Sequence, residues 1–270
     1  MSFSPGSVND KKDENVRGLI SAGTELAGGT VSAAIGALLG AAVAGPPGAI
    51  VGGVAGTAAV ISLRRAGEEI SERVLGPREK VRAGAVLAIA AAEIKSRSAA
   101  GEPLRTDDFF DPGSRGRSPA EEVAESVLLK AQREPEERKV RFMGYLLSSI
   151  AFDAEINPEL AHQLTKAAEQ LTYRQLCILK LAVTKGGFAL RASDYRGQPR
   201  FDKDLLQVLY ECFDLYQRGY INNGGSVAFG PSDMTPASLT TQGLGSYLYN
   251  LMKLQDIPAE DVRAIGGLLA

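Results

Sequence analysis

The longest apolar stretch of the chain covers residues 26–63, and no charged residue interrupts it. Two prolines divide it, and proline removes a backbone donor and disfavours the α conformation in the residue before it. The pattern predicts a helix over about residues 16–44, a tight turn, and a second helix over about residues 49–75. The turn would consist of Gly45, Pro46 and Pro47. Together these elements form a helical hairpin.

Small residues recur at every fourth position through this hairpin. They are Gly28, Ser32, Gly36, Gly40, Ala44, Gly48, Gly52 and Gly56. A step of four keeps side chains near one face of a helix, and glycine there costs about 1 kcal/mol relative to alanine. Such a stripe is unfavourable in an isolated helix, and close packing against another helix is the usual compensation. The stripe therefore predicts self-association through this face.

The length and the flanking charges of the hairpin favour a membrane location. The uncharged run of about 38 residues suffices for two short spans, because a bilayer needs about 17–25 residues for each. Basic residues flank it at both ends, namely Lys11, Lys12, Arg17, Arg64 and Arg65. The positive-inside rule would place both ends in the cytoplasm. Alanine and glycine are only weakly apolar, so two alternatives stay open: a soluble hairpin buried in an oligomer, or one stored in protein contacts until it inserts.

Residues 28–56 resemble the glycine-zipper hairpins of membrane-active and pore-forming bacterial proteins. The resemblance implies a chain that associates with membrane lipid and forms homo-oligomers in a bacterial inner membrane, either from the start or after a cytoplasmic resting state. It also implies a pore or a depolarised membrane as the outcome, as with bacterial self-killing effectors of antiviral defence.

Composition limits the remaining possibilities. The chain has 270 residues, enough for a sizeable core and two modules, and its formal net charge of −2 gives no general attraction to nucleic acid. Its two cysteines, Cys177 and Cys212, form no CxxC pair, which excludes a disulfide scaffold and fits a reducing cytosol. Residues 1–15 are polar and lack the apolar core of a secretory signal, so we expect a disordered tail there.

Charged residues follow the apolar stretch at helical spacing. They would form the i,i+4 ion pairs Arg64–Glu68 and Arg65–Glu69. We therefore expect the second hairpin helix to continue as a polar stem until Gly76 and Pro77 end it. The next helix, from Pro77 to about Ser98, carries an apolar run too short to cross a bilayer, which predicts a buried core helix.

A long loop, residues 101–117, interrupts the helical domain predicted for residues 76–170. Asp107, Asp108 and Asp111 match no metal-binding loop and are more typical of a solvated acidic turn. The neighbouring pair Phe109-Phe110 is expected to anchor the loop on the body of the domain.

Three helices are predicted after this loop, beginning at Ser118, at about Pro135 and at Pro158. Ser118 would cap the first helix, and Glu121 would complete a capping box. The lone histidine, His162, has no second potential metal ligand nearby in sequence, so a surface position is expected.

Residues 171–256 follow a different pattern, in which helices are mixed with short strands. Thr172 would cap a helix that ends at Gly186 and Gly187, and Asp202 would begin a second helix that reaches Gln217. Strands are predicted at residues 188–191, from residue 219 to 221 and at residues 227–229, with a turn at 222–225 and a helix at 246–254. Residues 257–270 would add a last short helix.

The order of helix, helix, β-wing and helix resembles winged-helix domains. Two strings carry this resemblance: residues 215–221, where a long helix would enter the wing, and residues 239–243, where a second strand would re-enter a helix. The second helix of this domain is acidic, with Asp202, Asp204, Glu211 and Asp214 against Lys203. Because phosphate repels such a face, we expect a protein partner rather than DNA.

The loop before that helix is basic. It carries Lys185, Arg191, Arg196 and Arg200. This cluster either contacts an anion or a partner, or is simply solvated.

The expected fold class is mainly α, with an N-terminal glycine-zipper helical hairpin over residues 16–75, a central helical bundle, and a winged-helix-like C-terminal domain with a small β-wing. The function we expect is a membrane-inserting effector that a protein partner triggers through the helical and winged-helix part. The alternative is a membrane-tethered adaptor or regulator. We expect neither an enzyme nor a cofactor, because the sequence holds no nucleophile–base set, metal-ligand cluster or phosphate-binding loop.

Overall fold

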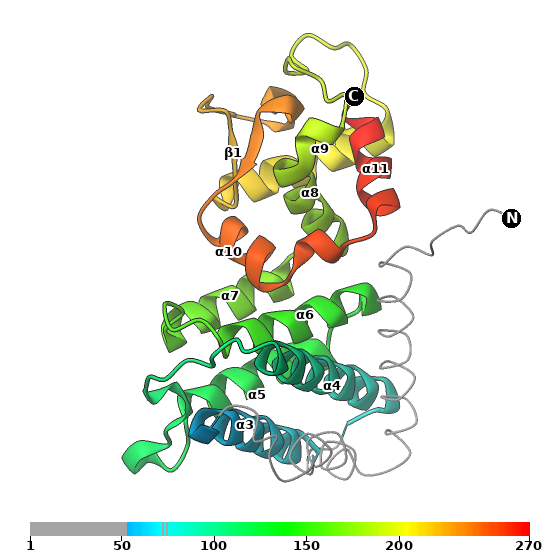
Figure 1. Ribbon diagram of the computed structural model, residues 1–270. Coiled ribbons are helices and arrows are strands. Elements are labelled where there is room, and N and C mark those ends of the chain that lie inside the picture. The colour runs from blue at the N-terminus through cyan, green and yellow to red at the C-terminus, as the bar shows by residue number, and fades with distance from the viewer. Residues whose placement is uncertain (1–52, 72, 74) are drawn as a thin grey trace, which may run out of the picture. The chain divides into compact units, whose positions relative to one another are not determined.

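The computed structural model describes residues 53–71, 73 and 75–270. Within them the protein is mainly helical, with nine α-helices and one two-stranded sheet, so the predicted mainly α class is confirmed at this level (Figure 1). The predictions for the N-terminal tail, the first hairpin helix, the turn and the stripe up to Gly52 lie outside the described residues. The chain divides into two compact units, residues 1–169 and 170–270. The second unit begins one residue before the predicted C-terminal domain.

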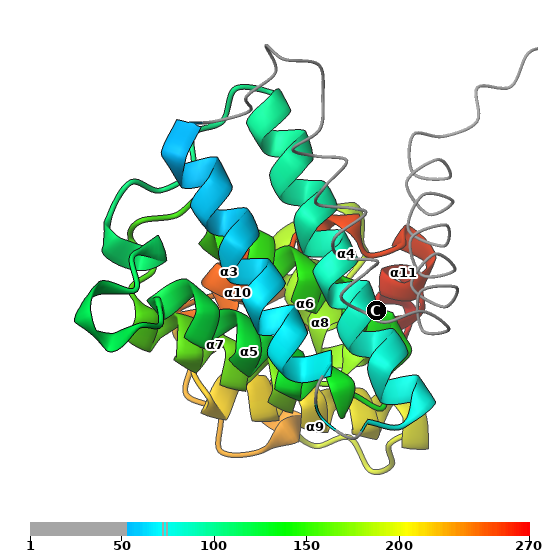
Figure 2. The same ribbon diagram turned by 90° about the horizontal axis from the view of Figure 1, so that it is seen from below.

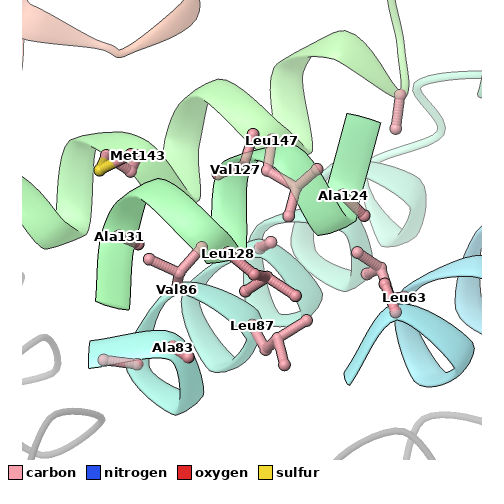
Figure 3. Close-up of a cluster of buried hydrophobic side chains, with 14 of the residues drawn as sticks. Leu63, Ala83, Val86, Leu87, Ala124, Val127, Leu128, Ala131, Met143 and Leu147 are labelled. Carbon is pink, nitrogen blue, oxygen red and sulfur yellow. The ribbon is translucent and has the colours of Figure 1, made fainter. Parts of the chain in front are cut away.

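Five helices make up the described part of the N-terminal unit. They are α3 (Gly53–Ser71), α4 (Pro77–Ala99), α5 (Pro119–Gln132), α6 (Glu137–Ile150) and α7 (Pro158–Gln170). Helix α4 packs against α5 and α6, and α3 packs against α5 and α4 (Figure 2). The core between them is built from aliphatic side chains such as Val86, Leu128 and Met143 (Figure 3). The predicted core helix therefore exists as α4, at nearly the predicted bounds.

The helices of this unit begin at residues that the sequence marks clearly. The Ser118 hydroxyl accepts a hydrogen bond from the Glu121 backbone N–H at 3.3 Å, which confirms the predicted cap of α5. The Asn157 side chain accepts one from the Leu160 N–H at 2.8 Å at the start of α7. The capping box at α5 is wrong, because the Glu121 carboxylate binds Arg65 of α3 instead. His162 lies on α7 and is partly exposed.

The long loop before α5 is held by a buried arginine. Arg105 donates to the carbonyl oxygens of Ile150 and Ile156, at 3.2 and 2.8 Å, and to both carboxylate oxygens of Asp107. Its guanidinium also lies 4.0 Å from the centre of the Phe109 ring, which is buried. The predicted aromatic anchor is thereby confirmed for Phe109. The loop contains two 3-10 turns, η1 (Asp108–Phe110) and η2 (Gly113–Arg115).

The C-terminal unit combines four helices with the small sheet. The helices are α8 (Tyr173–Thr184), α9 (Lys203–Gln217), α10 (Leu244–Leu251) and α11 (Ala259–Leu268), and the strands are β1 (Ile221–Asn223) and β2 (Leu239–Thr241). Short 3-10 turns η3 to η6 connect them, at Lys185–Gly187, Pro231–Asp233, Pro236–Ser238 and Leu254–Asp256. Thr172 and Asp202 cap α8 and α9 as predicted.

Both cysteines are buried as free thiols, and burial raises the pKa of Cys212 to about 12.

The strand pairing differs from the prediction. Strand β1 pairs antiparallel with β2, in the register Ile221 opposite Thr241, and residues 227–229 form no strand. The side chain of Asn223 binds the segment between the two strands. Its Nδ2 donates to the Asp233 carbonyl oxygen, and its Oδ1 accepts from the Thr235 N–H. The strand predicted at 188–191 is also absent, although Arg191 exchanges backbone hydrogen bonds with residues 237 and 269.

Candidate functional site: the interface between α3 and α5

Helix α3 is the described end of the predicted membrane hairpin and also a part of the folded N-terminal unit. It lies beside α4 and over α5 in Figure 2, and it begins inside the uncharged stretch, ten residues before that stretch ends at Leu63. Gly56 is the one member of the small-residue stripe in this helix. The interface of α3 with α5 therefore joins the described end of the predicted hairpin to the rest of the N-terminal unit.

One face of α3 is buried in the core of the unit. Ala59, Leu63, Ala66 and Ile70 recur at steps of three and four, and each is at most 6% exposed. Figure 3 shows Leu63 on the side of α3 that faces Ala124 of α5. The sequence predicted that the helix continues past the apolar stretch as a polar stem, and α3 does continue to Ser71, with its charged side exposed and its apolar side packed in the core.

Two buried hydroxyls meet at the centre of this interface. The Oγ atoms of Ser62 and Ser118 lie 3.4 Å apart, and each residue is at most 3% exposed. Ser62 also donates to the carbonyl oxygen of Ala58 at 3.0 Å, in the preceding turn of α3. Since Ser118 caps α5, this contact places the start of α5 directly against the middle of α3.

Ion pairs flank the apolar face. Arg65 lies 3.0 Å from Glu121, and Arg117 lies 2.7 Å from both Glu69 and Glu125. Arg73, two residues beyond the end of α3, forms a further pair with Glu125. The predicted pair Arg65–Glu69 is therefore wrong, because each partner binds a residue outside α3. The predicted pair Arg64–Glu68 is present at 3.6 Å.

The electrostatics of this cluster centre on Arg117. Burial lowers the pKa of its guanidinium, but the hydrogen bond and the negative charge of Glu125 outweigh burial, so the pKa is raised. Arg117 is the last residue of the long loop, so it ties the loop to α3 and α5 at once. We call the contacts of Ser62, Arg65, Glu69 and Arg73 with Ser118, Glu121, Glu125 and Arg117 the α3 clasp.

A small, almost entirely apolar pocket remains beneath α3. It is lined by Ala59, Ser62, Leu63, Ile94, Phe109, Phe110, Ala120, Leu147, Ile150 and Ala151. The side chains that α3 contributes are mostly small, so the helix fills the space above α4 and α6 incompletely. Incomplete packing forfeits dispersion contacts and leaves α3 less firmly held than a fully packed helix.

The predicted basic cluster lies in the C-terminal unit and does not converge on one point. Arg191 donates to Ser193 and to the carbonyl oxygen of Asp194, while Arg196 donates to Asp233 at 2.8 Å. Lys185 lies in η3, and Arg200 is exposed in the loop that leads to α9. The sequence interpretation missed Asp233, whose pKa is lowered by the Phe229 N–H and then by Arg196. Arg191 and Arg196 therefore bind residues of the C-terminal unit itself, within and beside the loop that leads to α9.

Other chemical sites are scarce in the residues that the structure describes. They contain no group of three or more His, Cys, Asp or Glu side chains placed to hold a metal ion. Asp107, from the predicted acidic turn, is paired with Arg105, and this hydrogen bond lowers its pKa. None of the helices from α3 onward has both the length and the apolar character that a membrane span requires.

Comparisons with known protein families, with curated proteins and with solved structures found no match to this chain. The interpretation of the site therefore rests on its own geometry. The contacts of Ser62 with Ser118 and of Arg73 with Glu125 were not identified from the sequence, because nothing local indicates contacts between residues about fifty positions apart.

Proposed function

We propose that the protein is a membrane-inserting effector that permeabilises or depolarises a bacterial inner membrane. In this proposal the N-terminal hairpin associates with other copies through its small-residue stripe. The central helices and a winged-helix-like C-terminal domain form the cytoplasmic part through which a protein partner triggers insertion.

One observation carries the proposal: the uncharged stretch does not end at the folded unit but continues into it. Ala59 and Leu63 belong both to the apolar run and to the buried core. A plain membrane tether would need only a linker at this point. A helix built into the core gives the folded part a mechanical connection to the hairpin, as a triggered effector requires.

The proposal is tested by membrane potential in cells that express the full chain, reported by a potential-sensitive dye. We expect depolarisation and growth arrest, and we expect both to vanish when residues 26–63 are deleted. Gly36→Leu, on the stripe, should also abolish depolarisation because the added side chain prevents close helix packing. Ala34→Leu adds a similar bulk off the stripe and should retain it. Depolarisation that survives both the deletion and Gly36→Leu would overturn the proposal.

A second candidate is a membrane-tethered adaptor that binds a protein through its C-terminal unit. Exposed apolar side chains in that unit favour it, since Phe229 is 86% exposed and Val227 is 61% exposed on the loop between β1 and β2. The acidic face expected for the second helix of this domain is partly neutralised in α9, because Glu211 binds Arg174 and Asp214 binds Arg218. An adaptor would fractionate with membranes, leave the potential intact and keep its partner after Gly36→Leu.

A further inference from the structure

Residues at the start of α3 take part in two arrangements that compete with each other. In the structure, Ala59 and Leu63 are buried among the side chains of the N-terminal unit. In an inserted hairpin, the same residues would lie in the hydrocarbon of the bilayer. We propose that α3 is an autoinhibitory element: docked on α5 through the α3 clasp, it holds the hairpin out of the membrane, and permeabilisation requires α3 to leave α5. This inference rests on the proposed function and names its regulation.

The two arrangements exclude each other for reasons of charge. Ala59 lies about 9 Å along the helix from Arg65, at 1.5 Å per residue, which is well inside the hydrocarbon if the arginine marks the membrane surface. Phe109 lines the same pocket as Ala59, and its chain neighbour Asp108 carries a charge. Inserting α3 while it stays docked would carry this carboxylate toward the hydrocarbon, which is strongly unfavourable.

The contacts that hold α3 on α5 are weak enough for α3 to dissociate from it. The buried face of α3 carries three small side chains, Ala59, Ser62 and Ala66, beside Leu63 and Ile70, and a small pocket remains beneath it. Its ion pairs use arginines that are about half exposed, Arg65 at 49% and Arg73 at 45%, so water and salt screen them. Helix α4 also packs against α5 and α6, so these three helices keep their contacts with one another when α3 leaves.

The test is a reversible covalent lock between α3 and α5 in the full chain. Ser62→Cys with Ser118→Cys places two thiols in contact, where the hydroxyls lie 3.4 Å apart. Formation of the disulfide, with its S–S bond of about 2.05 Å, brings the two side chains closer together. Leakage of carboxyfluorescein from vesicles of phosphatidylethanolamine and phosphatidylglycerol is then measured before and after reduction. We expect the oxidised double variant to lose leakage completely and to regain it with dithiothreitol.

Each single variant, treated with the same oxidant, should leak at or above the wild-type rate, because it loses a contact of the α3 clasp and cannot form the lock. Recovery of leakage after reduction shows that the disulfide, and not misfolding of the double variant, caused the loss of leakage. Leakage by the oxidised double variant at the rate of its reduced form, with the disulfide verified by mass spectrometry, would overturn the inference.

A second measurement keeps the two proposals distinguishable. Leu63→Cys introduces a thiol at a buried position of α3, and the native Cys177 and Cys212 are buried in the other unit, so they give a low background. Maleimide labelling of this thiol should accelerate when the same vesicles are added, because α3 leaves the core. Faster labelling without leakage would overturn the proposed function alone, whereas unchanged labelling would overturn the release of α3.

Discussion

The guanidinium of Arg65 lies 3.0 Å from the carboxylate of Glu121, across the interface between α3 and α5. The two ends of this pair differ in exposure, since the Glu121 side chain is 6% exposed and the Arg65 side chain 49%. The buried charge of Glu121 is therefore compensated by Arg65. The exposed guanidinium of Arg65 can instead donate hydrogen bonds to water. Loss of α3 would leave a carboxylate at the start of α5, where the helix dipole partly stabilises it.

Glu121→Gln is expected to loosen α3 specifically. The substitution keeps the shape of the side chain but removes the charge that attracts Arg65, at a cost of about 1 kcal/mol for a pair that is partly screened. Hydrogen exchange should accelerate in residues 58–70 and remain unchanged in α6, and vesicle leakage should rise. Glu159→Gln, at an exposed position of α7, is the matched control and should change neither quantity. Unaltered exchange in α3 would show that this ion pair does not hold the helix.

Arg105→Ala is expected to be one of the most destabilising substitutions in the N-terminal unit. It removes donors from the carbonyl oxygens of Ile150 and Ile156 and leaves Asp107 without its partner. Loss of a buried, hydrogen-bonded charge of this kind costs about 2–4 kcal/mol of unfolding free energy. Urea denaturation would measure the loss, and limited proteolysis should show cleavage within residues 101–117. Arg133→Ala, on an exposed arginine, should change the stability by less than about 0.5 kcal/mol.

Arg105→Lys should recover only part of this stability. Lysine is charged but lacks the planar fork that reaches two carbonyls and a carboxylate together. A variant as stable as the wild type would mean that charge alone, and not the geometry of the guanidinium, holds the loop.

Local and non-local features of this fold differ in how far the sequence predicts them. Ser118, Thr172 and Asp202 begin their helices as predicted, because a cap depends on residues within one turn. The pairing of β1 was predicted wrongly, because the adjacent Gly224 and Gly225 indicate a tight hairpin, whereas Asn223 bonds to residues ten and twelve positions further on.

The same difference explains the result at the candidate site. Arg65 and Glu69 have the spacing of an intrahelical ion pair, but Glu121 and Arg117 compete for them from a loop and a helix distant in sequence. The apolar spacing of Ala59, Leu63, Ala66 and Ile70 was present in the sequence, and it indicates burial without naming the surface that covers it.

Asp107 should make stability depend on pH in the acid range. Its hydrogen bond to Arg105 lowers the pKa of Asp107 below the ordinary value of 3.8, so the folded state binds this proton less readily than the unfolded state. The stabilisation is therefore fully present above about pH 5 and is lost as pH falls through the lowered pKa. In urea denaturation, the stability difference between wild type and Asp107→Asn should be largest near neutral pH and should shrink below pH 4. A difference that stays constant to pH 2 would mean that ionisation of Asp107 does not contribute.

Two glycines of the N-terminal unit should respond in opposite directions to the same substitution. A Cβ atom at Gly144 of α6 would lie 2.8 Å from the Cβ of Ile89 and 3.2 Å from the carbonyl oxygen of Val86, so α6 and α4 approach closely only because this position has no side chain. Gly144→Ala should destabilise the protein by about 1–3 kcal/mol through overpacking. A Cβ at Gly84 of α4 would meet nothing within 4 Å, and Gly84→Ala should stabilise by about 0.5–1 kcal/mol through helix propensity. Thermal unfolding of the two variants beside the wild type measures both effects. A Gly144→Ala variant that melts at or above the wild-type temperature would refute the close approach of α4 and α6 at Gly144.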